Sequence, residues 1–113
     1  MTSQTSQVLQ NHLQAAARNV DAVMRDYSDQ SVLVTGDRTY RGLSEIRAFF
    51  SQLLEGPTGG FLKTMKMHRQ EIVGDVGYIL WEAKPWFAFA TDTFVVRDGK
   101  ILYQTFASTS VAV

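Results

Sequence analysis

The chain has no cysteine, and this absence excludes several kinds of site at once. Disulfide frameworks, thiolate zinc sites and cysteine nucleophiles all need a thiol. A chain without cysteine has a reducing compartment as its default, so we expect a cytoplasmic protein. The two histidines, His12 and His68, form no HxH or HExxH motif, and we therefore expect no metal site.

An excess of charge is also lacking, because eleven Lys and Arg residues balance eleven Asp and Glu residues. Without a run of basic residues the chain lacks the electrostatic footprint of a nucleic-acid binder. No apolar run approaches the roughly 20 residues that span a bilayer. P-loop, GxGxxG and nucleophile-elbow motifs are missing as well. We therefore expect no cofactor, no nucleic-acid partner and no membrane partner.

The chain is long enough for one domain with a hydrophobic core of its own. Its first residues, MTSQTSQ, have neither the basic nor the apolar region of a signal peptide. We interpret residues 1–6 as a flexible tail and residues 7–113 as a single domain.

Helical spacing dominates the first half of the chain. Apolar residues recur at steps of three and four over residues 5–28, which predicts a bent helix or two helices in tandem. Asn19 and Asp21 are both suitable caps for a second segment. A further helix is expected to begin at a Ser44 cap and to end at the Gly- and Pro-rich residues 56–60.

Period-two patterns predict the strands. The expected segments are residues 31–35 and 39–41, which form a small hairpin, then residues 62–73, 76–84 and 90–106, the last folded back around Asp98-Gly99. Helices thus come first and a meander of long strands follows. This segregation predicts an α+β fold in which the helices cover one face of a strongly curved sheet.

One carboxylate stands on the apolar side of its strand. Alternation places Asp92 on the same face as Phe94 and Val96. On the neighbouring strands, Trp81 and Gln104 occupy positions from which they can converge on Asp92. A partly desolvated carboxyl group has a raised pKa and is suited to acid/base chemistry. The alternative is a solvated Asp, or one that caps a nearby backbone group.

Two segments together resemble the nuclear transport factor 2-like superfamily, in its SnoaL-like branch. They are DAVMRDYSDQSVLVTGDRTYRGLSEIRAFF, from Asp21 to Phe50, and TDTFVVRDGKI, from Thr91 to Ile101. The resemblance implies a cone-shaped, cystatin-like α+β barrel, whose curved, mixed but mostly antiparallel sheet wraps around N-terminal helices. It also implies a pocket at the wide end and a homodimer formed through the outer sheet face. Ketosteroid isomerases, polyketide cyclases, epoxide hydrolases, dehydratases and non-enzymatic binding domains share this fold, so the fold alone does not select a function.

The ketosteroid isomerases provide an informative comparison. Asp92 matches the position of their protonated oxyanion-hole Asp. Their general-base Asp falls at about Thr35 here, and their oxyanion-hole Tyr falls near Leu13. Thr accepts no proton near neutral pH and Leu donates nothing, so we expect no steroid isomerase activity. A SnoaL-type cyclase needs only one positioned base, which Asp92 would supply.

The candidate site has one catalytic residue, Asp92, and a set of ligand-binding residues. Those predicted to bind the ligand are Trp81, Ile79, Phe50, Phe94, Gln104, Tyr27 and His68. Strand alternation groups Lys66, His68 and Gln70 but does not show which face is inward, and His12 is expected at the surface.

Two functions stay open. One is a cofactor-independent acid/base enzyme, of a cyclase, isomerase or hydrolase-like kind, acting on a small hydrophobic carbonyl compound. The other is a non-catalytic binding or dimerisation module whose cavity is filled by aromatic side chains. The short loops leave few residues to close over a substrate, which favours the second function a little.

Overall fold

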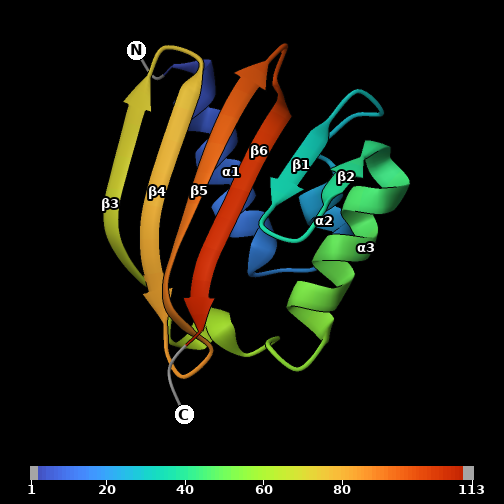
Figure 1. The fold of residues 1–113 in the computed structure, drawn as a ribbon. Helices are drawn as coiled ribbons and strands as arrows, with labels where there is room; N and C mark the ends of the chain where they lie inside the picture. The colour runs from blue at the N-terminus through green and yellow to red at the C-terminus, as the bar shows by residue number, and fades with distance from the viewer. Residues whose placement is uncertain (1–2, 111–113) are drawn as a thin grey trace.

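The computed structural model describes residues 3–110, which form three α-helices, one short 3-10 helix and a six-stranded sheet. Along the sheet the strand order is β2-β1-β6-β5-β4-β3. Neighbouring strands are antiparallel except for the β1 and β6 pair, which is parallel. The sheet is strongly curved and does not close, and α1 lies behind its long strands (Figure 1). The predicted α+β class with a curved, mostly antiparallel sheet is confirmed.

The N-terminal segment forms two helices in tandem, which was one of the two predicted arrangements; the other was a single bent helix. Ser3 caps α1 by accepting a hydrogen bond from the backbone N–H of Ser6, at 3.1 Å. Asn19 caps α2, because its Oδ1 accepts from the backbone N–H of Ala22 at 2.8 Å. Residues 4–6, which the sequence assigned to the tail, therefore lie in the first turn of a helix. The bounds are Gln4–Ala16 for α1 and Val20–Met24 for α2.

The short hairpin leads directly into α3. Gly42 begins this helix with a φ of +80°, a conformation that favours glycine. Glu45 accepts a hydrogen bond from the backbone N–H of Arg41 at 2.9 Å, and Ser44 lies inside the helix, so the predicted Ser44 cap is wrong. The bounds are Val32–Thr35 for β1, Thr39–Arg41 for β2 and Gly42–Glu55 for α3.

The second half of the chain is a meander of four strands. The strand predicted from residue 62 begins later, because residues 61–63 form the 3-10 helix η1 under the end of α3. The bounds are Phe61–Lys63 for η1, Lys66–Val73 for β3, Val76–Ala83 for β4, Phe87–Arg97 for β5 and Lys100–Ser110 for β6.

A β-bulge interrupts the alternation of side chains along β3. Met67 pairs with Trp81 and Arg69 pairs with Leu80, so His68 is the extra residue between them. The predicted grouping of His68 with Gln70 is therefore wrong. Gln70 lies beside α1, whereas His68 binds Glu82 on the other face.

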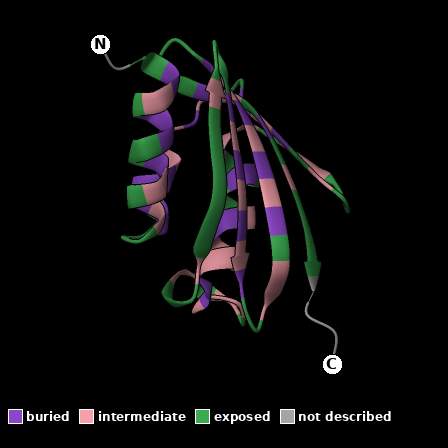
Figure 2. Cartoon of the chain, turned by 90° about the vertical axis from the view of Figure 1, so that its left-hand side faces the viewer, coloured by how far each residue is buried: buried purple, intermediate pink, exposed green. Residues whose placement is uncertain are grey.

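The core lies between the concave face of the sheet and the helices. Along β5, buried residues alternate with more exposed ones (Figure 2), and α1 packs against this strand. α3 packs beside α2 and the short strands at one end of the sheet. Within residues 3–110 no helix is both long enough and apolar enough to cross a membrane. This arrangement leaves a hollow where α1, α3 and η1 meet the sheet, and Asp92 borders it.

Candidate acid/base pocket

Asp92 lies on the concave face of β5 with only 6% of its surface exposed. Its register partners are Ile79 on β4 and Phe106 on β6. Side chains two positions further along these strands are diagonal neighbours on the same face, within reach of long side chains. Trp81 and Gln104 occupy those diagonal positions, so the strand register itself brings both to the carboxylate.

Both carboxylate oxygens of Asp92 accept hydrogen bonds. Trp81 donates from its indole Nε1 to Oδ2 at 2.8 Å, and Gln104 donates from its amide Nε2 to Oδ1 at 3.0 Å. Carboxylate oxygens have about four lone-pair sites in total, so capacity remains on each oxygen. The two bonds fix the carboxylate in place without using up its ability to accept a proton.

Tyr27 fixes the orientation of the Gln104 amide. Its buried hydroxyl donates a hydrogen bond to Oε1 of Gln104. Burial raises the pKa of Tyr27 well above its usual value, with the negative charges of Asp92 and Asp26 adding to the effect. The phenol therefore stays protonated, and Gln104 is held with its N–H group toward Asp92. A chain of hydrogen bonds thus connects Tyr27, Gln104 and Asp92.

Burial raises the pKa of Asp92 from 3.8 to about 6. The hydrogen bonds from Trp81 and Gln104 oppose this rise, as does the positive charge that His12 can carry. Desolvation is the larger effect, because the apolar surroundings disfavour the charged form. A carboxyl group with this pKa is mostly ionised at pH 7 and still takes up a proton readily, which suits a general base.

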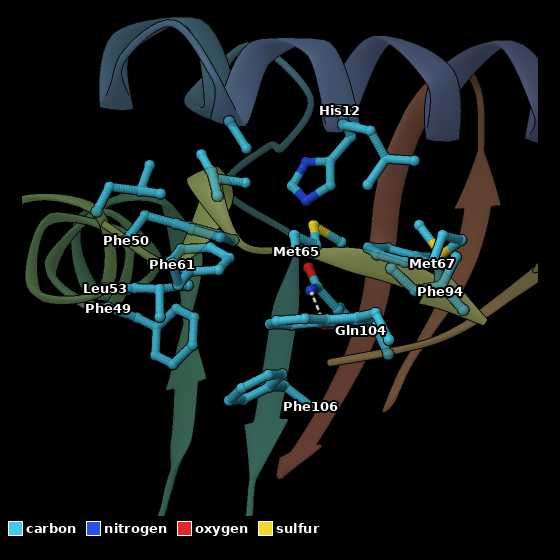
Figure 3. Close-up of a pocket in the computed structure, with 17 residues that line it drawn as sticks. His12, Phe49, Phe50, Leu53, Phe61, Met65, Met67, Phe94, Gln104 and Phe106 are labelled. Atoms are coloured by element: carbon cyan, nitrogen blue, oxygen red, sulfur yellow. Dashed lines mark hydrogen bonds between the residues drawn. The ribbon is translucent and has the colours of Figure 1, made fainter. Parts of the chain in front are cut away.

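A pocket with a cavity volume of about 150 Å³ lies over Asp92. The side chains around it come from α1, α3, η1 and strands β3 to β6, and almost all are apolar (Figure 3). The residues lining it are His12, Leu13, Ala16, Phe49, Phe50, Leu53, Leu54, Phe61, Leu62, Met65, Met67, Ile79, Trp81, Asp92, Phe94, Gln104 and Phe106. Asp92, Gln104 and His12 thus place polar groups in an otherwise apolar pocket.

Six of the eight site residues predicted from sequence line this pocket. They are Asp92, Trp81, Ile79, Phe50, Phe94 and Gln104. Tyr27 stands one step behind, in contact with Gln104. His68 is not brought to the pocket: its side chain is 48% exposed and pairs with Glu82 at 2.8 Å on the other face of the sheet. Met67 takes the pocket side of β3, and the alternation of a strand then places its neighbour His68 on the opposite face.

His12 is the polar pocket residue that sequence reasoning missed. The expectation of a surface position is wrong, because only 5% of His12 is exposed. Its ring packs edge-on against Tyr27, Phe50 and Phe94, with ring centroids 5.3–5.8 Å apart. The signal was available: His12 follows Val8 by four residues and so shares its buried helix face.

Asp26 accompanies His12 in the core. Its Oδ2 lies 3.4 Å from Nδ1 of His12, close enough for an ion pair when the imidazole is protonated, and neither atom has a hydrogen-bond partner among the residues described. The Asp26 side chain is 14% exposed, so the pair connects the pocket to the edge of the solvent. Elsewhere in the described chain, no three His, Asp or Glu side chains gather in a way that would hold a metal ion.

The sequence matches no protein-family model and no curated protein. Solved structures do resemble the chain. An NTF-2-like protein of unknown function from Burkholderia xenovorans is 18% identical, with a TM-score of 0.76 over 97% of this chain and 86% of that one. An LEH-like epoxide hydrolase from M. tuberculosis is also 18% identical, with a TM-score of 0.68 over 96% of this chain and 84% of that one.

A de novo designed protein with a curved β-sheet is similar too. It is 16% identical, with a TM-score of 0.77 over 96% of this chain and 88% of that one. A design and an enzyme therefore share this architecture, as expected where fold and function are separable. The resemblance seen in the sequence is confirmed at the level of structure: the chain has the fold of the NTF2-like and SnoaL-like proteins.

Proposed function

We propose that the protein binds a small, largely apolar carbonyl compound and acts on it by acid/base chemistry at Asp92, without a cofactor. The observation that carries this proposal is a buried carboxylate with a pKa of about 6 at the wall of an apolar pocket. Perturbed carboxylates of this kind cluster at functional sites. The hydrogen bonds that Trp81 and Gln104 donate fix the orientation of the carboxylate.

The reaction is the removal of a proton from the carbon next to a carbonyl group. The carboxylate of Asp92 forms an O–H bond with the proton as the C–H bond breaks. The freed electron pair becomes a C=C bond, and the carbonyl π electrons move to the oxygen. Return of a proton to the same carbon, or to another, completes an exchange or an isomerisation. Apolar walls exclude water and strengthen the electrostatic interactions of the site.

The size of the pocket limits the compound. A cavity of roughly 150 Å³ is large enough for one benzene ring. A six-membered cyclic ketone is therefore a suitable probe, whereas a four-ring steroid is far too large for the space present. This limit agrees with the loss of the steroid isomerase residues at Thr35 and Leu13.

The epoxide hydrolase of similar fold supports a catalytic function, since that protein is an enzyme. The alternative is a binding module without turnover. In favour of that alternative, both oxygens of Asp92 are already hydrogen-bonded and aromatic side chains fill much of the enclosure. The two functions differ in one respect that is measurable, which is whether Asp92 moves protons of a bound ketone.

Proton exchange of cyclohexanone in D₂O tests the proposal. The loss of the α-proton signal is followed by ¹H NMR with and without protein, at pH 7. We expect exchange above the buffer rate for the wild type and exchange at the buffer rate for Asp92→Asn. Asp37→Asn, which changes an exposed turn carboxylate, serves as the matched control and should keep the wild-type rate. Saturable binding of cyclohexanone without exchange would favour the binding module instead.

We further propose that a second copy of the chain covers the outer face of the sheet. A cross-strand row of apolar side chains lies there, in which Val95 pairs with both Val76 and Tyr103. Tyr103 is 50% exposed and Val76 is 39% exposed. Exposed aromatic and aliphatic side chains on adjacent strands are typical of protein interfaces. The zero net charge of the chain means that two copies do not repel each other at neutral pH.

A further inference from the structure

His12 projects from α1 into the pocket, opposite the wall that carries Asp92. Figure 3 shows its ring above Gln104, with Phe50 and Phe61 to one side and Phe94 and Met67 to the other. One ring nitrogen, Nδ1, is directed to Asp26 at 3.4 Å. No hydrogen bond is found for the other nitrogen, Nε2, among the residues described, and only 7% of the side chain is exposed. Unlike Nδ1, Nε2 is not among the buried atoms that lack a partner, so it is accessible and a ligand in the pocket can hydrogen-bond to it.

The other polar groups of the pocket are already engaged. Trp81 and Gln104 donate to Asp92, and Tyr27 donates to Gln104. Three titratable groups face His12. They are Asp26 and Tyr27, in the segment after α2, and Asp92 on β5. When the imidazole is protonated, Nε2 of His12 can donate a strong hydrogen bond to a ligand oxygen in the pocket.

We propose that His12 is the second catalytic residue of this pocket, the acid that protonates the ligand oxygen while Asp92 removes the carbon-bound proton. Asp26 is its positioning residue. This inference rests on the proposed function of Asp92 and names the group that works with it. The arrangement assigns the ligand a direction, with its carbonyl oxygen toward α1 and its acidic C–H bond toward β5.

The step is balanced in atoms and charge. Asp92 takes the α-proton and becomes neutral as the C–H electron pair forms the C=C bond. The carbonyl oxygen takes the proton of Nε2, and the N–H electron pair stays on the imidazole. The products are a neutral enol, a neutral Asp92 and a neutral His12, where the reactants were a ketone, a carboxylate and an imidazolium. The net charge of the pocket is unchanged throughout.

Charge conservation matters because the walls are apolar. An enolate formed without His12 would be an uncompensated anion in a poorly solvating enclosure, which is costly. Protonation of the oxygen in the same step avoids that anion. Asp26 supports the imidazolium with an opposite charge 3.4 Å from Nδ1, on the side away from the ligand.

Two measurements test the proposal. The first is the carboxyl-carbon NMR titration of Asp92 in His12→Gln without any ligand. Because the charge of His12 lowers the pKa of Asp92, the titration midpoint of Asp92 should rise above about 6 in this variant. His68→Gln, which removes the exposed histidine outside the pocket, is the matched control and should leave the midpoint unchanged. An unchanged midpoint in His12→Gln would show that His12 does not act on Asp92.

The second measurement is cyclohexanone exchange in the same variants. A general acid typically contributes 10²-fold or more, so His12→Gln should lower the exchange rate by about 100-fold, with His68→Gln at the wild-type rate. Asp26→Asn should lower it less and should change the ¹⁵N shifts of His12, because an amide can donate to Nδ1 and select the other tautomer. Wild-type exchange in a folded His12→Gln protein would overturn the role of His12 and leave Asp92 in place. No exchange by the wild type would instead overturn the proposed function.

Discussion

The stability of the protein should fall as the pH rises through the range in which Asp92 ionises. Asp92 has a pKa of 3.8 when exposed and about 6 in the folded protein. Between these values the folded state binds more protons than the unfolded state, so the free energy of unfolding decreases with increasing pH. At 1.36 kcal/mol per tenfold change, the full loss is about 3 kcal/mol. It begins near pH 4 and is complete above about pH 6.

Urea unfolding at a series of pH values from about 3.5 to about 8, a range that spans both pKa values of Asp92, measures this effect. The signal is the difference between the wild type and Asp92→Asn, because the variant lacks the titrating group. Other carboxylates cancel in that difference. The hydrogen bonds of Asp21 with Arg47 and of Glu82 with His68 lower the pKa values of these two carboxyl groups, so both contribute in the opposite direction, equally in the two proteins. A difference that is flat with pH, or that grows with pH in favour of the wild type, would refute a desolvated Asp92.

Three further outcomes follow from the contacts of the pocket and the outer face. Trp81→Phe removes the indole N–H that stabilises the carboxylate, so the pKa of Asp92 should rise above about 6 in a carboxyl-carbon NMR titration; a lower value would contradict the hydrogen bond. Tyr27→Phe leaves Oε1 of Gln104 buried without its donor and should cost about 1–3 kcal/mol of unfolding free energy in urea; a cost near zero would mean that the phenol does not hold the amide. Tyr103→Glu places a charge on the outer face, so light scattering should report a dimer for the wild type and a monomer for the variant; a wild-type monomer would end the dimer proposal.

The strand segments were predictable because their side chains alternate. Asp92 shares its face with two apolar residues, and this simple pattern was enough to place it inside the fold. The convergence of Trp81 and Gln104 followed from the same alternation on the neighbouring strands. The hydrogen bonds could not be predicted, since they depend on the register of three strands, which the sequence pattern limits but does not determine.

The errors have local physical causes. His68 was misplaced because alternation alone does not show which face of β3 is inward, and the pocket side is taken by Met67; the bulge then puts Gln70 on the face opposite His68. His12 was misplaced because its polar sequence neighbours were given more weight than its position on the helix, where Val8 lies one turn before it on the same buried face. Ser44 has the chemistry of a cap, yet the positive φ of Gly42 starts α3 earlier.

The pairing of His12 with Asp26 illustrates a limit of a different kind. Nothing in the sequence brings α1 and the segment after α2 together, because the two residues lie on elements whose relative position is set by packing on the sheet. Only the folded chain places Nδ1 of His12 beside the carboxylate of Asp26. The second polar wall of the pocket therefore emerges from tertiary structure.

The titration of Asp92 by carboxyl-carbon NMR, with and without cyclohexanone, tests the central claim most directly. Asp92→Asn assigns the signal. The account predicts a pKa of about 6 that moves when the ketone occupies the pocket, because a bound ligand removes the remaining water from the carboxylate. A pKa at or below 3.8 that is indifferent to the ketone would contradict the account and identify Asp92 as a structural carboxylate.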